Sequence, residues 1–332
     1  MKHANVAIFV PHNGCPNQCS FCEQRNITGI SYQPNLKDIR EAIDIALQSL
    51  SENVKNAEIA FFGGSFTAID RDYMMELLDC AYECVKLYSF AGIRISTRPD
   101  AIDNQILDIL KDRAVTSIEL GAQSMNDKVL DMNNRGHTSL DVKNASQLIK
   151  EKGFSLGLQM MTGLYGSNQD IDYETGKQIV NLHPDTVRIY PTIIMKNTLL
   201  HELYKSKVYM PMGFDEMVSL CSRLLNLFNE AGIQVIRLGL HNVKSLNDNM
   251  VAGSWHPSFK EICESKIFID KIIKYLNFNK CHGNDIIITI NPKDVSKVVG
   301  YKKCNLHILN NMGYKVTIKQ DSNVNLKEFI IK

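Results

Sequence analysis

The stretch that decides the fold is residues 14–22, GCPNQCSFC, with Cys15, Cys19 and Cys22 in the spacing C-x3-C-x2-C. It follows the apolar run 6–10, which predicts a buried strand, so the thiols lie at the carboxyl end of that strand. Three clustered thiolates are soft ligands that suit an iron–sulfur cluster or zinc. A closed structural zinc site needs a fourth ligand, and none stands at a usual spacing here. Three cysteines on a four-iron cluster would leave one iron open to another ligand.

Length and composition describe an ordinary globular chain. Its 332 residues suffice for one large domain and a small one. The formal net charge is +1, so any contact with nucleic acid has to come from a local patch. No apolar run approaches the ~18 residues of a membrane span, and the N-terminus lacks the apolar core of a signal peptide. Nine cysteines without framework spacing argue against a secreted disulfide scaffold, so we expect free thiols and a cytoplasmic location.

Short β-branched runs alternate with longer helical patterns through residue 240. This repetition predicts a parallel sheet with right-handed crossovers in an α/β protein. We predict a partial, TIM-like (β/α)6 barrel over residues 1–240 and a small α/β extension over residues 241–332. The expected strands are 6–10, 58–62, 93–97, 115–120, 155–161 and 186–190, with 234–239 closing the region, and the expected helices include 35–50, 71–88, 103–113, 139–152, 170–181 and 214–231.

Polar residues and glycines follow the predicted strands. The second strand ends in GGS at residues 63–65, the third in Thr97, the fourth in Gln123 and the sixth in Tyr190. Because the carboxyl ends of parallel strands meet at one edge, we expect these residues to lie together beside the cysteine loop. Two glycines after a strand let a ligand approach the backbone and leave amide N–H groups free to donate, although a tight turn explains them equally well.

Six motifs, GCPNQCSFC, GGSF, STRPD, ELGAQS, NRGHT and RIYPT, occur in this order over about residues 6–240. The cysteine spacing, with Phe21 before the last cysteine, resembles the signature of the radical-SAM superfamily. Together the motifs look like the radical-SAM domain of the catalytic-subunit family of the Elongator complex. That family modifies the wobble uridine of tRNA and also carries an acetyl-CoA-binding acetyltransferase domain. About ninety residues follow here, and nothing in them resembles that domain, which puts acetyl-CoA use in doubt.

The resemblance implies roles for individual residues. Three cysteines, Cys15, Cys19 and Cys22, would hold a [4Fe–4S] cluster whose open iron binds S-adenosylmethionine. The other candidates for binding this cofactor are Phe21 near the adenine, Gly63, Gly64 and Ser65 around the methionine amino group, Thr97 and Gln123 at the nucleoside, and Arg135 on the methionine carboxylate. A planar two-donor fork suits the last role, and a surface arginine is the alternative. Tyr190, the catalytic candidate, would face the nucleoside or the substrate, unless it is an ordinary half-buried tyrosine.

The implied reaction is a radical one. A reductant such as flavodoxin or ferredoxin would reduce the cluster, and cleavage of S-adenosylmethionine would yield a 5′-deoxyadenosyl radical that abstracts hydrogen from an unreactive C–H bond. The expected substrate is RNA, above all tRNA. Two alternatives stay open, namely a radical-SAM enzyme acting on a small molecule or protein, and a non-enzymatic RNA adaptor whose cysteines hold zinc.

The C-terminal sixty residues form a pattern of their own. A strand (285–290), a short helix (292–298), the turn GYKK (300–303), a helix (305–312) and a strand (314–320) are expected. A helix–GxxG–helix between strands is how a KH domain clamps a nucleic-acid backbone, although Lys303 replaces the second glycine here. Lys302 and Lys303 suit phosphate contacts and are the RNA-binding candidates; a small appendage with a solvated basic turn is the alternative.

Overall fold

A seven-stranded sheet organises the structure, a computed structural model that describes residues 4–11, 15, 18–23, 32–240, 242, 244–279 and 284–332. Every neighbouring pair in the sheet is parallel, in the order β1-β2-β3-β4-β5-β6-β8. The strands are β1 (Ala4–Val10), β2 (Ala57–Gly63), β3 (Gly92–Thr97), β4 (Val115–Gln123), β5 (Ser155–Thr162), β6 (Thr186–Pro191) and β8 (Gln234–Leu238). The predicted partial barrel is confirmed, and β8 adds a seventh strand to the six expected repeats.

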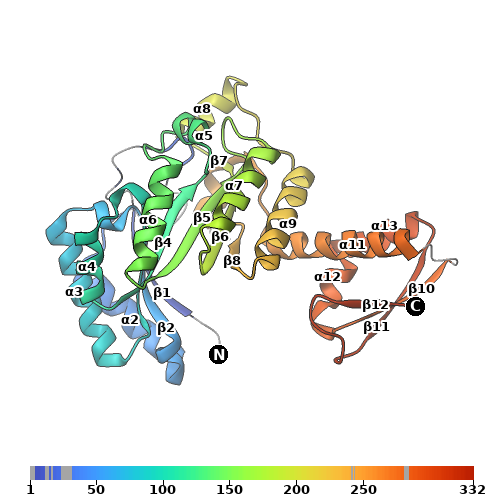
Figure 1. Cartoon of the computed structure of the whole chain (residues 1–332), viewed down its shortest axis with the longest axis horizontal. Helices are drawn as coiled ribbons and strands as arrows, with labels where there is room; N and C mark the ends of the chain where they lie inside the picture. The colour runs from blue at the N-terminus through green and yellow to red at the C-terminus, as the bar shows by residue number, and fades with distance from the viewer. Residues whose placement is uncertain are drawn as a thin grey trace.

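Helices cover the outer face of this sheet (Figure 1). They are α2 (Leu36–Leu50), α3 (Arg71–Tyr88), α4 (Asn104–Asp112), α5 (Asp127–Met132), α6 (Ser139–Glu151), α7 (Gln169–Asn181) and α9 (Phe214–Glu230). Five of them begin at a polar side chain that accepts a hydrogen bond from a backbone N–H of the first turn, namely Asp70, Asp103, Asn126, Thr138 and Asn168. These caps are why the helix starts agree with the sequence pattern to within a residue.

The two faces of the sheet differ in polarity because side chains alternate along each strand. The outer face carries fully buried apolar residues such as Ile59, Ile95 and Ile118, which belong to the main hydrophobic core. The inner face carries Glu58 and Arg94 instead, and both are buried. A sheet with one apolar face and one charged face leaves its inner side available for polar ligands.

Segments after β6 lie around the carboxyl edge of the sheet. The strand β7 (Ile193–Met195) pairs antiparallel with β9 (Met250–Gly253) in a separate two-stranded sheet. Helix α8 (Leu199–Lys205) follows β7, and α10 (Lys244–Asn249) precedes β9. All four elements are short, which is why periodicity in the sequence did not predict them.

The helix α11 (Phe259–Asn279) leads from the barrel to a C-terminal unit (Figure 1). That unit contains β10 (Asp285–Ile290), α12 (Val295–Val299), α13 (Cys304–Asn311), β11 (Lys315–Gln320) and β12 (Phe329–Ile331). In its three-stranded sheet β10 is parallel to β11 and antiparallel to β12. The expected order of strand, helix, turn, helix and strand is found, whereas a domain boundary at 240/241 stays a prediction.

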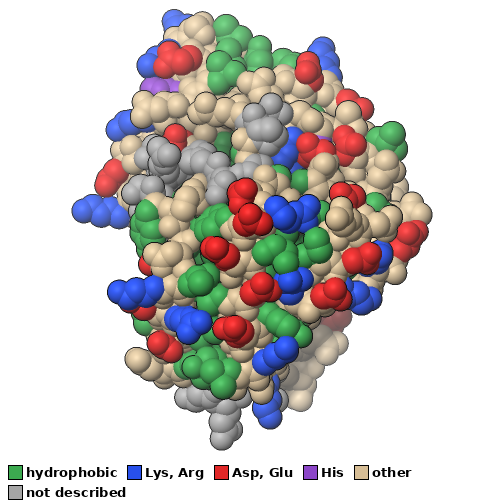
Figure 2. All heavy atoms as spheres, turned by 90° about the vertical axis from the view of Figure 1, so that its left-hand side faces the viewer, with side chains coloured by type: hydrophobic (Ala, Val, Ile, Leu, Met, Phe, Trp, Pro, Cys, Tyr) green, Lys and Arg blue, Asp and Glu red, His purple; other side chains and the backbone are tan. Residues whose placement is uncertain are grey.

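The surface over the helices shows no charge of a single sign. On the face seen in Figure 2, acidic and basic side chains are interspersed among hydrophobic ones. None of the helices in the described ranges has the length and apolar composition needed to cross a membrane.

Candidate functional site

Ser20 fixes the cysteine loop between two helices. Its N–H donates to the Asn133 carbonyl (3.1 Å) and its hydroxyl donates to Asn133 Oδ1 (2.6 Å), while its carbonyl accepts from the N–H of Leu200 in α8 (2.8 Å). Asn133 lies at the end of α5, and Ser20 and Asn133 are both fully buried. The sequence gave no signal for this anchor, because it joins residues 113 positions apart.

The three cysteines lie on the part of the loop that Ser20 anchors. Cys19 is buried, and Arg135 Nη1 donates to its sulfur at 3.0 Å. Cys15 Sγ lies 3.8 Å from Ser65 Oγ. Burial raises the pKa of the Cys22 thiol to about 12, the thiols of Cys19 and Cys15 raise it further, and Arg135 opposes them. The thiols are therefore close enough to influence one another, and a cationic group stands beside them.

This donor set fits an iron–sulfur cluster better than a single metal ion. Within the described ranges, no three His, Cys, Asp or Glu side chains are grouped so that they could hold one ion. A tetrahedral zinc, with Zn–S bonds of ~2.3 Å, would bring its sulfurs to within about 4 Å of one another. A four-iron cluster is larger and anionic, and hydrogen bonds to its sulfurs are a common means of tuning it. The contact of Arg135 with Cys19 Sγ is of that kind.

The glycine turn after β2 lies beside the loop for a backbone reason. Gly63 has φ +113°, and a Cβ there would lie 2.9 Å from the Val10 carbonyl oxygen, so only glycine allows the ends of β1 and β2 to come this close. The N–H of Gly64 donates to the same carbonyl at 2.8 Å. The expectation that the amides of this turn are free to bind a ligand is therefore wrong for Gly64, because the interstrand contact uses its N–H. Ser65 is buried and faces Cys15.

At the end of β3 it is Ser96 that has unused hydrogen-bonding capacity. Thr97 pairs with Thr67, their hydroxyl oxygens 2.7 Å apart, and the Thr67 hydroxyl donates to the Ala101 carbonyl. Ser96 stands opposite Glu119 in the register of β3 and β4, so its side chain is on the inner face. Its buried hydroxyl has no hydrogen-bond partner among the described residues. Strand alternation from Arg94 would have identified Ser96, which the motif STRPD alone did not.

Gln123 and Arg135 come together at the end of β4. Arg135 Nη2 donates to the Gly121 carbonyl at 2.8 Å, and a Cβ on Gly121 would lie 3.0 Å from Gln123 Nε2 and 3.4 Å from Arg135 Nη2. Gly121 therefore leaves the room that both side chains occupy. Gln123 Oε1 and Arg135 Nε are buried and, within the described part of the chain, have no partner. Together with Ser96 they offer donors and acceptors that a polar ligand would satisfy.

A buried charge network crosses the inner face below these residues. Glu119 accepts two hydrogen bonds from Arg188, at 2.6 and 2.9 Å, and one from Arg94 at 3.1 Å. Arg94 also donates to Glu58 at 2.7 Å. Burial raises the pKa of Glu119, but Arg188 and Arg94 outweigh burial and hold that pKa below its usual range. The network therefore stays ionised and fixes four strands relative to one another.

Tyr190 belongs to the same network. It lies two residues after Arg188 on β6, and burial raises the pKa of its phenol, while Arg188, which is hydrogen-bonded to it, opposes that rise. The catalytic role of Tyr190 stays a prediction.

Phe21 packs away from the inner face. Its ring is partly buried against a small cluster of Ile194, Leu200 and Tyr209. The predicted contact with adenine is untested by this placement.

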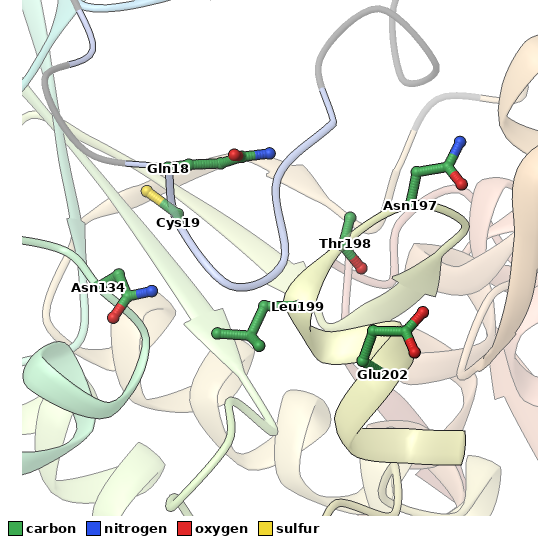
Figure 3. Close-up of a pocket in the computed structure, with 7 residues that line it drawn as sticks. All are labelled: Gln18, Cys19, Asn134, Asn197, Thr198, Leu199 and Glu202. Carbon is green, nitrogen blue, oxygen red and sulfur yellow. The ribbon is translucent and has the colours of Figure 1, made fainter. Parts of the chain in front are cut away.

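A polar pocket of about 420 Å³ adjoins the cysteine loop (Figure 3). Cys19 and Asn134 stand on one side of it, while Asn197 and Glu202 stand on the other. It is lined by Gln18, Cys19, Asn134, Asn197, Thr198, Leu199 and Glu202. The pocket gives the loop a polar neighbour on the side of α8.

The other predicted residues, Lys302 and Lys303, are not part of this site. They lie between α12 and α13 on the C-terminal unit, away from α5 and α8 (Figure 1). Both side chains are exposed.

Comparison with known proteins agrees with this geometry. Residues 9–175 match the radical SAM superfamily, and residues 184–268 match the radical SAM C-terminal domain. The chain is 30% identical over 253 residues to Elongator complex protein 3 of Homo sapiens, and 29% identical over 260 residues to a tRNA uridine(34) acetyltransferase of Methanocaldococcus jannaschii. These matches cover 67% and 66% of this chain but only 46% and 48% of the relatives, so the chain spans about half of their length.

Solved structures share the fold. An archaeal Methanocaldococcus infernus Elp3 with an N-terminal deletion superposes with a TM-score of 0.63 at 21% identity, covering 85% of this chain and 64% of that one. Methylornithine synthase superposes with a TM-score of 0.50 at 14% identity, covering 84% of this chain and 86% of that one. At these identities the likeness concerns the fold alone.

Proposed function

Because the chain belongs to the radical SAM superfamily, we propose that it is an enzyme that binds a [4Fe–4S] cluster on Cys15, Cys19 and Cys22 and cleaves S-adenosylmethionine reductively in order to modify an RNA. The observation that carries this proposal is the contact of Arg135 with Cys19 Sγ at 3.0 Å, beside buried polar atoms that lack partners.

When bound and reduced, the cluster would supply the electron that splits S-adenosylmethionine into methionine and a 5′-deoxyadenosyl radical. The chain's residues would hold and orient the reactants. Arg135 is suited to the methionine carboxylate, since its Nε has no partner and its two terminal nitrogens already fix its position. Ser96 and Gln123 are suited to the nucleoside, because each offers one buried polar atom at a strand end.

The inner face would protect the reaction from water. The charge network around Glu119 is rigid and internally paired, so its groups need no solvent. Tyr190 is the group of this network that we propose to face the nucleoside or the substrate.

We propose tRNA as the RNA substrate because the relatives named above include a tRNA uridine(34) acetyltransferase. Acetyl transfer itself is not proposed, since the chain matches only about half of those relatives. A flavodoxin or ferredoxin of the cytoplasm would serve as the electron donor.

The test is anaerobic formation of 5′-deoxyadenosine. The protein is reconstituted with iron and sulfide, reduced with dithionite and incubated with S-adenosylmethionine. We expect Cys15→Ala, Cys19→Ala and Cys22→Ala each to abolish the product, and Cys304→Ala, at an exposed cysteine outside the site, to leave it unchanged. A reconstituted wild-type protein that retains its cluster but yields no 5′-deoxyadenosine would refute the proposed chemistry.

The substrate is tested in the same assay. Addition of unmodified bulk tRNA should increase 5′-deoxyadenosine formation, and mass spectrometry of the digested tRNA should reveal a changed nucleoside. Cysteine-dependent cleavage that ignores tRNA would keep the radical chemistry and direct the search to a small molecule or a protein.

A further inference from the structure

We propose that an aromatic row, defined as Phe214, His256 and Tyr301, together with Lys302 and Lys303 forms a binding site for a single-stranded segment of RNA. The choice of RNA rests on the proposed function above, whereas the site itself rests on the contacts that follow. This part of the molecule lies largely beyond the matched families, which end at residue 268.

The aromatic row joins the barrel to the C-terminal unit. The ring centroids of Phe214 and His256 are 6.4 Å apart, and those of His256 and Tyr301 are 5.0 Å apart, both pairs being edge-to-face. Phe214 is 38% exposed and Tyr301 49% exposed, so ring surface stays open to solvent. Aromatic faces that are rigid and half-exposed are where unstacked bases bind without regard to sequence.

The row begins at the edge of the sheet that carries the cysteine loop. Phe214 starts α9, directly after Met212, whose carbonyl accepts from Ser254 Oγ at 3.0 Å. Gly163 follows β5, and a Cβ on it would lie 3.9 Å from Met212 Cβ. The start of α9 therefore lies against a carboxyl strand end, and RNA on the row would lead toward that edge.

The turn after Tyr301 holds two cations in a strained backbone. Lys302 has φ +51° and Lys303 has φ +63°, both in the left-handed region that costs an ordinary residue roughly 1–2 kcal/mol. Glycine or asparagine would relieve this cost, yet lysine stands at both positions, and strain of this kind is concentrated where ligands are held. Lys302 Nζ lies 5.4 Å from the Tyr301 ring centroid, which places the cation beside the exposed ring.

Charge in the C-terminal unit favours an anionic partner. Residues 284–332 contain eight lysines against four aspartates and glutamates, a net charge of +4, whereas the whole chain has +1. The remaining residues therefore carry a net charge of −3. The barrel face in Figure 2 mixes both signs, so it offers no comparable attraction to a phosphate backbone.

The topology is compatible with backbone clamping. The turn at 300–303 connects α12 with α13, and these two helices connect the parallel neighbours β10 and β11. Helices joined by a short turn between two strands are the arrangement with which KH domains hold a single-stranded backbone.

The experiment measures RNA binding by the full chain with fluorescence anisotropy, using a labelled tRNA transcript and a labelled unstructured RNA oligonucleotide. The first variant, Lys302→Asn with Lys303→Asn, removes both charges but keeps a residue that tolerates the left-handed backbone. We expect about tenfold weaker binding at 0.1 M salt and a salt slope smaller by about 1.4, as two lost phosphate contacts require.

The second variant, Tyr301→Ala, removes the ring and keeps the charges. We expect about tenfold weaker binding with an unchanged salt slope, since stacking is not electrostatic. The matched control is Lys37→Gln with Lys143→Gln, two exposed lysines on the barrel helices α2 and α6, which should change binding less than twofold. Thermal unfolding of each variant reports whether the fold is retained.

The inference is overturned if the wild-type chain binds neither RNA, or if both variants bind like the control. Its failure is distinguishable from failure of the proposed chemistry. RNA-independent formation of 5′-deoxyadenosine should be unchanged in the Tyr301 and lysine variants, whereas Cys19→Ala should abolish it and still bind RNA.

Discussion

Arg135 is the residue on which the proposed cofactor site depends most. Its guanidinium reaches a cysteine sulfur and a backbone carbonyl with different nitrogens, at 3.0 and 2.8 Å. Lysine has a single ammonium and cannot reproduce that fork. We expect Arg135→Lys to retain the iron and sulfide content of wild type but to bind S-adenosylmethionine about tenfold more weakly, measured by equilibrium dialysis.

The matched control is Arg113→Lys, which alters an ion pair with Asp79 on the outer helices and should leave the affinity for S-adenosylmethionine unchanged. Wild-type affinity in Arg135→Lys would contradict the assignment of the methionine carboxylate to this residue.

Asp172 and His137 are buried groups with opposite effects on stability. Burial raises the pKa of Asp172 to about 6, although Ser167 and Gly163 donate hydrogen bonds to its carboxylate. Burial, aided by Arg135, lowers the pKa of His137 to about 4. Between these values the folded protein holds a proton on Asp172 that the unfolded chain has lost, and lacks a proton on His137 that the unfolded chain still binds.

Their variants should therefore show opposite pH trends. From about pH 4 to 6, Asp172 lowers the free energy of unfolding by roughly 3 kcal/mol and His137 raises it by a similar amount. Relative to wild type, Asp172→Asn should gain stability over this range and His137→Gln should lose it. Urea unfolding of the cluster-free protein at pH 4, 5 and 6 measures both, and parallel pH curves for all three proteins would contradict the argument.

At this scale the sequence predicted the residue types better than their partners. Cys19, Gln123 and Arg135 were identified from motifs, and they do lie at one edge of the sheet. Ser20 was missed because it binds Asn133 through a contact that only the folded chain creates.

The strands are held together by charge as well as by backbone hydrogen bonds. Glu119 on β4 binds Arg94 on β3 and Arg188 on β6, and its side chain is 1% exposed. Removal of one partner from a buried ionic network leaves the others uncompensated. We expect Glu119→Gln to lower the free energy of unfolding by about 3–5 kcal/mol in urea denaturation.

The comparison is Glu174→Gln, which breaks an exposed pair with Lys177 on α7 and should cost less than about 0.5 kcal/mol. Similar losses in the two variants would show that the inner-face network contributes no more than a surface pair.

Elements were predictable where local signals were long or capped. The strand–helix repeats have the expected order because apolar periodicity and N-cap residues mark them. The pairing of Glu119 with two other strands was not predictable, since it depends on register across the sheet. The short β7, β9 and α8 carry too few residues for a periodic signal.

The whole molecule has two hydrophobic cores that share α11. Phe259 and Cys263 in the first part of the helix belong to the barrel core, whereas Ile272 and Leu276 belong to the core under β10 and β11. We expect Ile272→Ala, at a fully buried position, to cost about 2–5 kcal/mol and to accelerate hydrogen exchange in the C-terminal unit more than in the barrel strands.

Leu224→Ala, at a fully buried position of the barrel core, is the matched comparison and should show the reverse pattern. Equal acceleration in both regions by either variant would mean that the two cores unfold as one cooperative unit.

The central claim is that Cys15, Cys19 and Cys22 hold a four-iron cluster with one iron open to S-adenosylmethionine. Electron paramagnetic resonance of the reduced, reconstituted protein tests it most directly. The account predicts a cluster signal whose g values change when S-adenosylmethionine is added, in wild type and in Cys304→Ala, and no such signal in Cys19→Ala. A wild-type cluster signal that S-adenosylmethionine leaves unchanged would contradict it.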